Sequence, residues 1–214
     1  MSRYNTRTQR WIKRLLPDKK KEIFQNKIDE ENIKSWEKRG KPMPPPHIVK
    51  VRTVKKFQAQ TSYEILVETG TFMGDMIEAQ LNNFKKIYSI ELSKKYWKNA
   101  KEKFKTESKV SLLKGDSGKV LHELISEIKK PAIFWLDGHY SGADTALGEK
   151  ISPIYEELEA IFKSEISHCI LIDDARLFNG TDDYPKLEEL KSFILQRRKN
   201  AKIAIDRDTI SVQY

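Results

Sequence analysis

The feature that most restricts the fold of this chain is a regular alternation of short apolar runs with longer helix-permissive segments. The apolar runs expected to form strands are 65–69, 86–91, 110–115, 132–137 and 168–173. The segments expected to form helices are 74–84, 93–105, 117–129, 150–164 and 184–199. Short apolar runs of this kind suit strands that are covered on both faces. An alternation repeated this often predicts a doubly wound α/β domain, with a mostly parallel sheet and helices on both faces.

The two ends of the chain follow other patterns. The C-terminal run KIAIDRDTISVQY predicts two short strands around a turn near 206–208, which adds an antiparallel strand and completes a sheet of seven strands. Residues 1–60 predict a helical extension, interrupted by the proline-rich run GKPMPPPH at 40–47. We therefore expect a helical N-terminal extension at 1–60 and a main domain at 61–214.

Charge is distributed unevenly along the chain. Residues 1–60 hold 17 Lys or Arg and 6 Asp or Glu, a net charge of +11, whereas the remaining residues have a net charge of −2. This asymmetry favours an anionic partner for the extension, such as phosphate, nucleic acid or a lipid surface. The alternative is a solvated basic arm without a specific partner. The weak apolar stripes of the extension are expected to pack on protein, either on the main domain or in a homodimer.

Composition excludes several protein classes. The chain has a single cysteine, Cys169, so no disulfide forms within it, and its position in the apolar run HCILI favours a core role. No apolar run approaches the roughly 20 residues of a membrane-spanning helix, and the first residues lack the apolar core of a secretory signal. We therefore expect a reducing, cytoplasmic setting.

Acidic side chains stand at the expected carboxyl end of every predicted parallel strand. They are Glu68, Glu91, Asp116, Asp137, Asp173 and Asp174. In doubly wound sheets, ligands bind beyond the carboxyl ends of the strands. Helix caps and turns explain one such residue well, but they do not explain acids at all five ends on one edge.

The first strand runs into a turn with two glycines, in the run ETGTFMG. Gly70 allows a tight turn, and Gly74 lets the following helix begin close to the strand. The middle glycine of a dinucleotide fingerprint is missing, and no Gly-Lys-Ser/Thr run marks a P-loop. A ligand with a ribose but no pyrophosphate fits better, with Glu91 placed to accept hydrogen bonds from the ribose hydroxyls.

These residues resemble the motifs of class I S-adenosylmethionine (SAM)-dependent methyltransferases. The run VETGTFMG resembles motif I, YSIEL the ribose-binding acid, LLKGDS the adenine-binding acid and FWLDGHYSG motif IV. The resemblance implies a Rossmann-like fold and SAM as the cofactor. It implies cofactor contacts from Glu68, Thr69, Gly70, Thr71, Phe72, Gly74, Glu91, Leu92, Asp116, Ser117 and Asp137. The chain departs from motif I at Phe72, which stands where the family has its middle glycine.

A second group of acids follows the fourth and fifth predicted strands. Three converging carboxylates, from Asp137, Asp173 and Asp174, repel one another unless a cation joins them, and oxygen ligands suit Mg²⁺ or another hard divalent ion. The alternative is that one of the paired acids caps a helix or pairs with Arg176. The pattern resembles the metal-dependent O-methyltransferases of the catechol and macrolide-sugar types. In that reading, Asp137 or His139 removes the proton of the acceptor hydroxyl.

Three functions are consistent with these residues. The first is a metal-assisted methyltransferase that acts on a hydroxyl of a small molecule or a sugar. The second is a methyltransferase of RNA or another nucleic acid, with the basic extension contacting phosphates. The third is a non-catalytic nucleoside-binding domain that keeps only the fold. The absence of an Asn-Pro-Pro-Tyr run after the fourth strand favours a hydroxyl acceptor over a base nitrogen.

Overall fold

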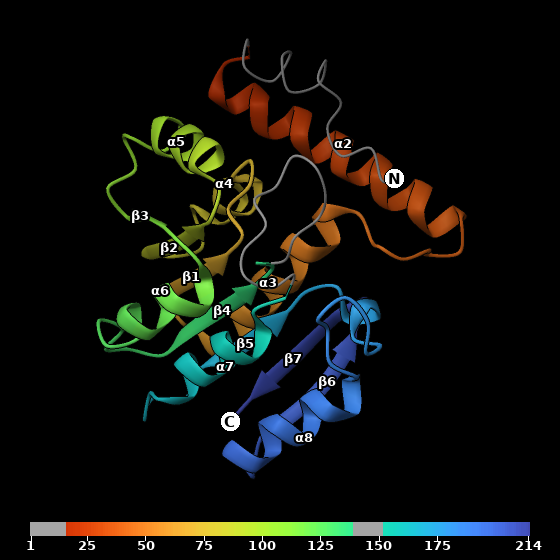
Figure 1. Cartoon of the computed structure of the whole chain (residues 1–214). Helices are drawn as coiled ribbons and strands as arrows, with labels where there is room; N and C mark the ends of the chain where they lie inside the picture. Colours follow the sequence, from red (N-terminus) through yellow and green to blue (C-terminus); the bar gives the residue numbers. More distant parts are fainter. Residues whose placement is uncertain (1–15, 139–151) are drawn as a thin grey trace. The chain divides into compact units, whose positions relative to one another are not determined.

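The computed structural model describes residues 16–138 and 152–214 of the chain (Figure 1). It divides into two compact units, Met1–Thr53 and Val54–Tyr214. The second unit contains the whole sheet. Its strands are β1 (Ile65–Thr69), β2 (Lys86–Glu91), β3 (Val110–Lys114), β4 (Ala132–Leu136), β5 (Cys169–Ile172), β6 (Lys202–Asp206) and β7 (Thr209–Gln213).

The seven strands form one sheet in the order β3-β2-β1-β4-β5-β7-β6. Neighbouring strands from β3 to β5 are parallel, whereas β7 is antiparallel to both β5 and β6. Every residue of β4 and β5 is buried, while the edge strands β3 and β6 are mostly half-buried or exposed. The predicted mostly parallel, doubly wound sheet of seven strands is therefore confirmed.

Helices alternate with the strands in the second unit (Figure 1). They are α4 (Asp75–Gln80), α5 (Lys94–Lys103), α6 (Ser117–Leu124), α7 (Ile154–Phe162), the 3₁₀ turn η1 (Ala175–Leu177) and α8 (Leu187–Arg197). Several are shorter than expected. Helix α4 ends at Gln80. The side-chain amide of Asn83 donates to the backbone carbonyl of Ala79 and so replaces a hydrogen bond that a longer helix would make.

One apolar core lies between the sheet and its helices. Its strand members include Val67, Phe134 and Ile170, and its helix members include Leu121 and Leu158. All five are fully buried. A core of this size holds the strands in register, so the carboxyl ends of neighbouring parallel strands meet at one edge.

The C-terminal hairpin has its turn at the predicted position, near 206–208. Strands β6 and β7 are joined by Arg207 and Asp208, whose φ angles of 47° and 70° are both left-handed. Two left-handed residues match the twist of a two-residue hairpin, although asparagine and glycine are the usual residues there. Asp208 is nevertheless buried, which gives it a role in the site described below.

The first unit contains α2 (Asp18–Lys38) and the beginning of α3 (His47–Thr61). The break expected at 40–47 is present, because no helix covers 40–46, and the Trp36 indole donates to the carbonyl of Pro42 at 2.8 Å. Helix α3 lies in the predicted helical extension, but the sequence analysis gave it no bounds of its own. Its run HIVKVRTVKK is rich in β-branched residues, which have low helix propensity, but a preceding proline is well suited to the start of a helix.

None of the described helices combines the length and the apolar character that crossing a membrane requires. The apolar residues expected to form a stripe before Pro17 lie almost entirely outside the described residues.

Candidate functional site

The predicted acidic strand ends lie on a single edge of the sheet. Thr69, at the end of β1, is in register with Ile90 of β2 and Leu136 of β4. Leu136 is in turn in register with Ile172 at the end of β5. The acids next to these residues therefore share one rim, here called the carboxyl rim.

The glycine turn at the end of β1 brings two strands into close contact. Gly70 has a φ of +83°, and a Cβ there would overlap the carbonyl oxygen of Asp137. Gly74 has a φ of +70°, and a Cβ there would lie 2.6 Å from the ring of Phe104. Both positions thus require glycine, for their backbone conformation and for lack of space.

Phe72 occupies the position where the motif usually has a glycine. Its φ of 46° is left-handed, a conformation that costs a residue with a side chain roughly 1–2 kcal/mol. Its backbone N–H donates to Glu91 Oε2 at 2.8 Å, and its half-exposed ring lies 4.7 Å from the ring of Tyr96. These two contacts offset the strain and hold the turn without the glycine.

Glu91 is the acid that orders this side of the rim. It is 7% exposed, and its Oε1 accepts a second hydrogen bond, at 2.7 Å, from the N–H of Ser93. A carboxylate offers about four lone-pair positions, so it can accept from ribose hydroxyls in addition to these two donors. Leu92, which follows it, is half-buried.

Glu68 lies beneath the rim rather than on its surface. Its Oε2 accepts from the Ser89 hydroxyl at 2.5 Å, and Ser89 Oγ lies 2.5 Å from Thr71 Oγ1. Burial raises the pKa of Glu68 to about 8, the Ser89 hydrogen bond lowers it, and the carboxylates of Asp137 and Glu91 raise it. Glu68 is therefore mainly protonated at neutral pH.

The remaining predicted cofactor residues lie around the same turn. Thr69 is fully buried, and its Oγ1 accepts from the N–H of Asp137 at 3.2 Å. Asp116 caps α6 by accepting from the N–H of Gly118 at 2.9 Å, and Ser117 is buried in the first turn of that helix. The cap explanation therefore applies to Asp116, which also stands at the rim.

Asp137, Asp173 and Asp174 converge at the ends of β4 and β5. Each offers a carboxylate oxygen, and these three oxygens all lie within 4.8 Å of one another. Asp173 and Asp174 are buried, while Asp137 is half-buried. Opposite oxygens around Mg²⁺ lie roughly 4.2 Å apart, twice the 2.1 Å ligand distance, so the three oxygens fit a hard divalent ion after a small adjustment.

The alternative predicted for these acids is also present. Arg176 Nη1 donates to Asp174 Oδ1 at 2.8 Å, and it also pairs with Asp208 of the hairpin turn. Pairing with Arg176 and convergence with the other two acids therefore occur together at Asp174. His139, the second candidate base, lies outside the described residues.

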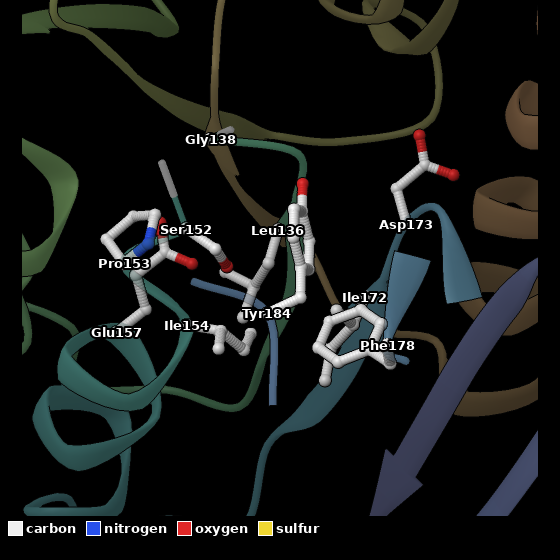
Figure 2. A pocket seen from close by; sticks show the side chains of 10 residues that line it. All are labelled: Leu136, Gly138, Ser152, Pro153, Ile154, Glu157, Ile172, Asp173, Phe178 and Tyr184. Atoms are coloured by element: carbon white, nitrogen blue, oxygen red, sulfur yellow. The ribbon is translucent and has the colours of Figure 1, made fainter. Parts of the chain in front are cut away.

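A small hollow that is open to solvent lies beside these acids (Figure 2). It is lined by Leu136, Gly138, Ser152, Pro153, Ile154, Glu157, Ile172, Asp173, Phe178 and Tyr184. Figure 2 shows the carboxylates of Glu157 and Asp173 separated in this view, with Tyr184 between them.

Most lining residues were not among the predicted site residues, and three of them have polar or aromatic side chains that matter for the site. Glu157 is 2% exposed although it lies in a charged helix, and Phe178 and Tyr184 come from the irregular chain after β5. The two aromatic rings meet edge to face, 5.3 Å apart. Burial raises the pKa of the Tyr184 hydroxyl, and so do the carboxylates of Asp174 and Asp137, so this hydroxyl stays a proton donor. No local sequence pattern marks these residues, because only the fold brings them together.

No protein-family model matches the chain, and no curated protein matches it. Solved structures do. An O-methyltransferase from Bacillus cereus in complex with SAH has a TM-score of 0.58 and 13% identity, with 100% of both chains covered. The SAH-bound methyltransferase PaMTH1 from Podospora anserina has a TM-score of 0.56 and 15% identity, over 93% of this chain and 97% of that one.

The O-methyltransferase TomG from Streptomyces achromogenes, in complex with SAM, also has a TM-score of 0.56, with 13% identity over 86% of this chain and 87% of that one. At such low identities the likeness concerns the course of the backbone. It agrees with the seven-stranded, mostly parallel sheet. The chain therefore has the Rossmann-like fold of the SAM-dependent methyltransferases.

Proposed function

We propose that this protein is a SAM-dependent methyltransferase that transfers a methyl group to a hydroxyl of a small molecule or a sugar, assisted by a divalent cation. The observation that carries the proposal is the composition of the carboxyl rim. A glycine turn and a ribose-competent carboxylate lie at the ends of β1 and β2, and three converging aspartates lie at the ends of β4 and β5.

The cofactor half of this rim consists of the turn 69–74 with Glu91 and Asp116. Glu91 is already fixed by two backbone N–H donors, so its orientation is set before a ligand arrives. Preorganisation of this kind reduces the entropy lost on binding. Asp116 is likewise fixed by its cap to Gly118, which leaves its second carboxylate oxygen to face an adenine amino group.

The acceptor half consists of Asp137, Asp173 and Asp174 with the hollow beside them. A divalent ion held there would draw in oxygens of the acceptor and lower the pKa of the hydroxyl to be methylated. Asp137 at the rim, or His139 just after it, is placed in the chain to take the hydroxyl proton. Tyr184, kept protonated, donates a hydrogen bond to an acceptor oxygen and helps to fix its position.

The residues around the hollow offer an acceptor both apolar and polar contacts. Phe178 and Tyr184 offer aromatic surface, and Glu157 and Asp173 offer carboxylate acceptors for hydroxyl groups. An apolar wall with a few polar groups is the usual composition of a small-molecule site.

The charge of the N-terminal extension favours a second candidate, a methyltransferase of RNA or another nucleic acid. Residues 1–60 carry a net charge of +11, which suits a phosphate backbone. Binding of a short RNA to the full chain and to residues 61–214, over a range of salt concentrations, separates the two candidates. Tight, salt-dependent binding that requires the extension would favour the nucleic-acid acceptor.

The main proposal is tested with the double variant Asp173→Asn and Asp174→Asn. We expect SAM to bind to the wild type and to the variant alike in calorimetry, because the cofactor half is unchanged. Methyl transfer from labelled SAM to a panel of sugars and phenols should require Mg²⁺ and should be lost in the variant. Asp206→Asn, an exposed acid in the same domain, is the matched control.

Each component of the proposal has its own contrary result. If the wild type does not bind SAM, the proposed activity is wrong, and the protein is a non-catalytic domain that shares only the fold. Full activity in the presence of a chelator would remove the cation and leave a metal-independent methyltransferase.

A further inference from the structure

The acid cluster is connected to the hairpin turn by one arginine. Arg176 Nη1 donates to Asp174 Oδ1 at 2.8 Å and pairs with Asp208 Oδ2. The backbone N–H of Arg176 donates to Asp208 Oδ1 at 2.9 Å, and the N–H of Ala175 donates to the carbonyl of Asp208 at 2.9 Å. Asp208 thus holds both the side chain and the backbone of η1, directly after the cluster.

Burial distinguishes this arrangement from an ordinary surface ion pair. The side chains of Asp208 and Asp174 are 2% and 7% exposed, and that of Arg176 is 33% exposed. Exposed ion pairs contribute little, whereas a buried carboxylate that loses its partner is strongly unfavourable. The three side chains therefore constrain one another.

Both acids also have strained backbones. Asp174 has a φ of 55° and Asp208 a φ of 70°, a region that L-residues rarely adopt. Aspartate, like asparagine, tolerates a left-handed position in a hairpin turn, and here its carboxylate also makes contacts of its own. It accepts two hydrogen bonds from Arg176, one from the backbone N–H and one from the guanidinium.

We propose that Asp208 is a positioning residue that acts through Arg176 to hold the Asp174 carboxylate in the geometry of the acid cluster. This inference rests on the proposed metal-assisted function. Arg176 is shared between two carboxylates, so it contacts one oxygen of Asp174. Without Asp208, the Arg176 guanidinium can instead donate to both carboxylate oxygens of Asp174. Those hydrogen bonds would compete with a cation for the same oxygens.

Two roles for Arg176, a purely electrostatic one and a positioning one, predict opposite effects of Arg176→Gln on cation binding. If only charge matters, Arg176→Gln removes a positive charge beside the cluster and strengthens cation binding. If Arg176 positions Asp174, the same substitution weakens cation binding, because Asp174 loses its support in a strained backbone. Substitution of a residue that hydrogen-bonds to a metal ligand typically weakens metal affinity by about 10- to 100-fold.

The test measures Mn²⁺ binding by electron paramagnetic resonance of the free ion, since Mn²⁺ takes the same oxygen ligands as Mg²⁺. We expect Asp208→Asn and Arg176→Gln each to weaken Mn²⁺ binding about tenfold. We expect the double variant to be no weaker than either single variant, because both act through one path. Asparagine tolerates the left-handed turn and keeps an oxygen for the N–H of Arg176, so Asp208→Asn should fold.

Asp206→Asn is the matched control, because Asp206 lies in the same hairpin but its exposed carboxylate pairs only with exposed cations, Arg207 and Lys56, among the contacts of the described residues. SAM affinity and melting temperature are measured for every variant to confirm that the cofactor half and the fold are intact. Unchanged Mn²⁺ affinity in Asp208→Asn, or tighter binding in Arg176→Gln, overturns the positioning role while the metal site stands. A wild type that binds no Mn²⁺ overturns the metal site and this role together.

Discussion

The cofactor half and the acceptor half of the rim hold their acidic side chains in different ways. In the cofactor half, Glu91 and Asp116 each accept from a backbone N–H two residues further along the chain. In the acceptor half, Asp174 is held by Arg176, and Arg176 is held by a residue 32 positions away. The first half is ordered by the loops that follow β1, β2 and β3, whereas the second is ordered by the C-terminal hairpin.

This difference indicates how far each half of the rim depends on distant parts of the chain. Loops that order themselves keep their geometry when distant parts of the chain change. A site held by tertiary contacts changes with each of the elements that hold it. We therefore expect substitutions in the cofactor half to act mainly on SAM, and substitutions around the acceptor half to act mainly on the cation and the acceptor.

The largest effect is expected where the two halves touch, at Gly70. Gly70→Ala combines a left-handed backbone with overlap of a Cβ on the Asp137 carbonyl, so we expect a loss of at least about 3 kcal/mol in unfolding free energy. Gly180→Ala is the control, because Gly180 has a φ of +89° but its Cβ would meet only the side chain of Lys186. Urea unfolding of both variants should show the smaller loss for Gly180→Ala, and equal losses would exclude the clash as the cause.

Glu68 lies below both halves and gives the next largest effect. The pKa of Glu68 is raised to about 8, so the folded protein keeps a proton that the unfolded chain releases above the ordinary glutamate pKa of 4.5. The unfolding free energy of the wild type should therefore fall as the pH rises from about 4.5 to about 8. Glu68→Gln removes this term and should be more stable than the wild type at pH 9, by a few kcal/mol.

Urea titrations at pH 5, 7 and 9 check this dependence. Glutamine keeps an oxygen to accept from Ser89, so the hydrogen-bond network is retained in the variant. Parallel pH profiles for the wild type and Glu68→Gln would mean that Glu68 ionises normally despite its burial.

The smallest effect on stability, and the sharpest test of the comparison, is expected at Glu91. Glu91→Ala removes the acceptor for the N–H groups of Phe72 and Ser93, which should cost about 1.5–3 kcal/mol and weaken SAM binding at least tenfold. Mn²⁺ binding by the acceptor half should be unchanged. Glu102→Ala, an exposed acid on α5 that pairs with Lys105, serves as control. A parallel loss of Mn²⁺ affinity in Glu91→Ala would show that the two halves are not independent.

The sequence predicted most of the fold because strand and helix patterns are local. The runs 65–69 and 86–91 became β1 and β2 with the same bounds, and the hairpin formed at the expected turn. The bounds of helix α3 were not predicted, because its β-branched residues have low helix propensity and its formation depends on packing. The carboxyl rim could also be predicted from the sequence, because the carboxyl ends of neighbouring parallel strands lie at the same edge of a sheet.

The sequence by itself determined the fold class and the acids at the strand ends, because hydrophobic periodicity and turn chemistry act over a few residues. Only the tertiary structure decided that Glu157, Phe178 and Tyr184 line one hollow, and that Asp208 reaches the cluster through Arg176. These residues come from separate elements whose proximity depends on the strand order. That order results from burial of the whole core, and no short stretch of sequence encodes it.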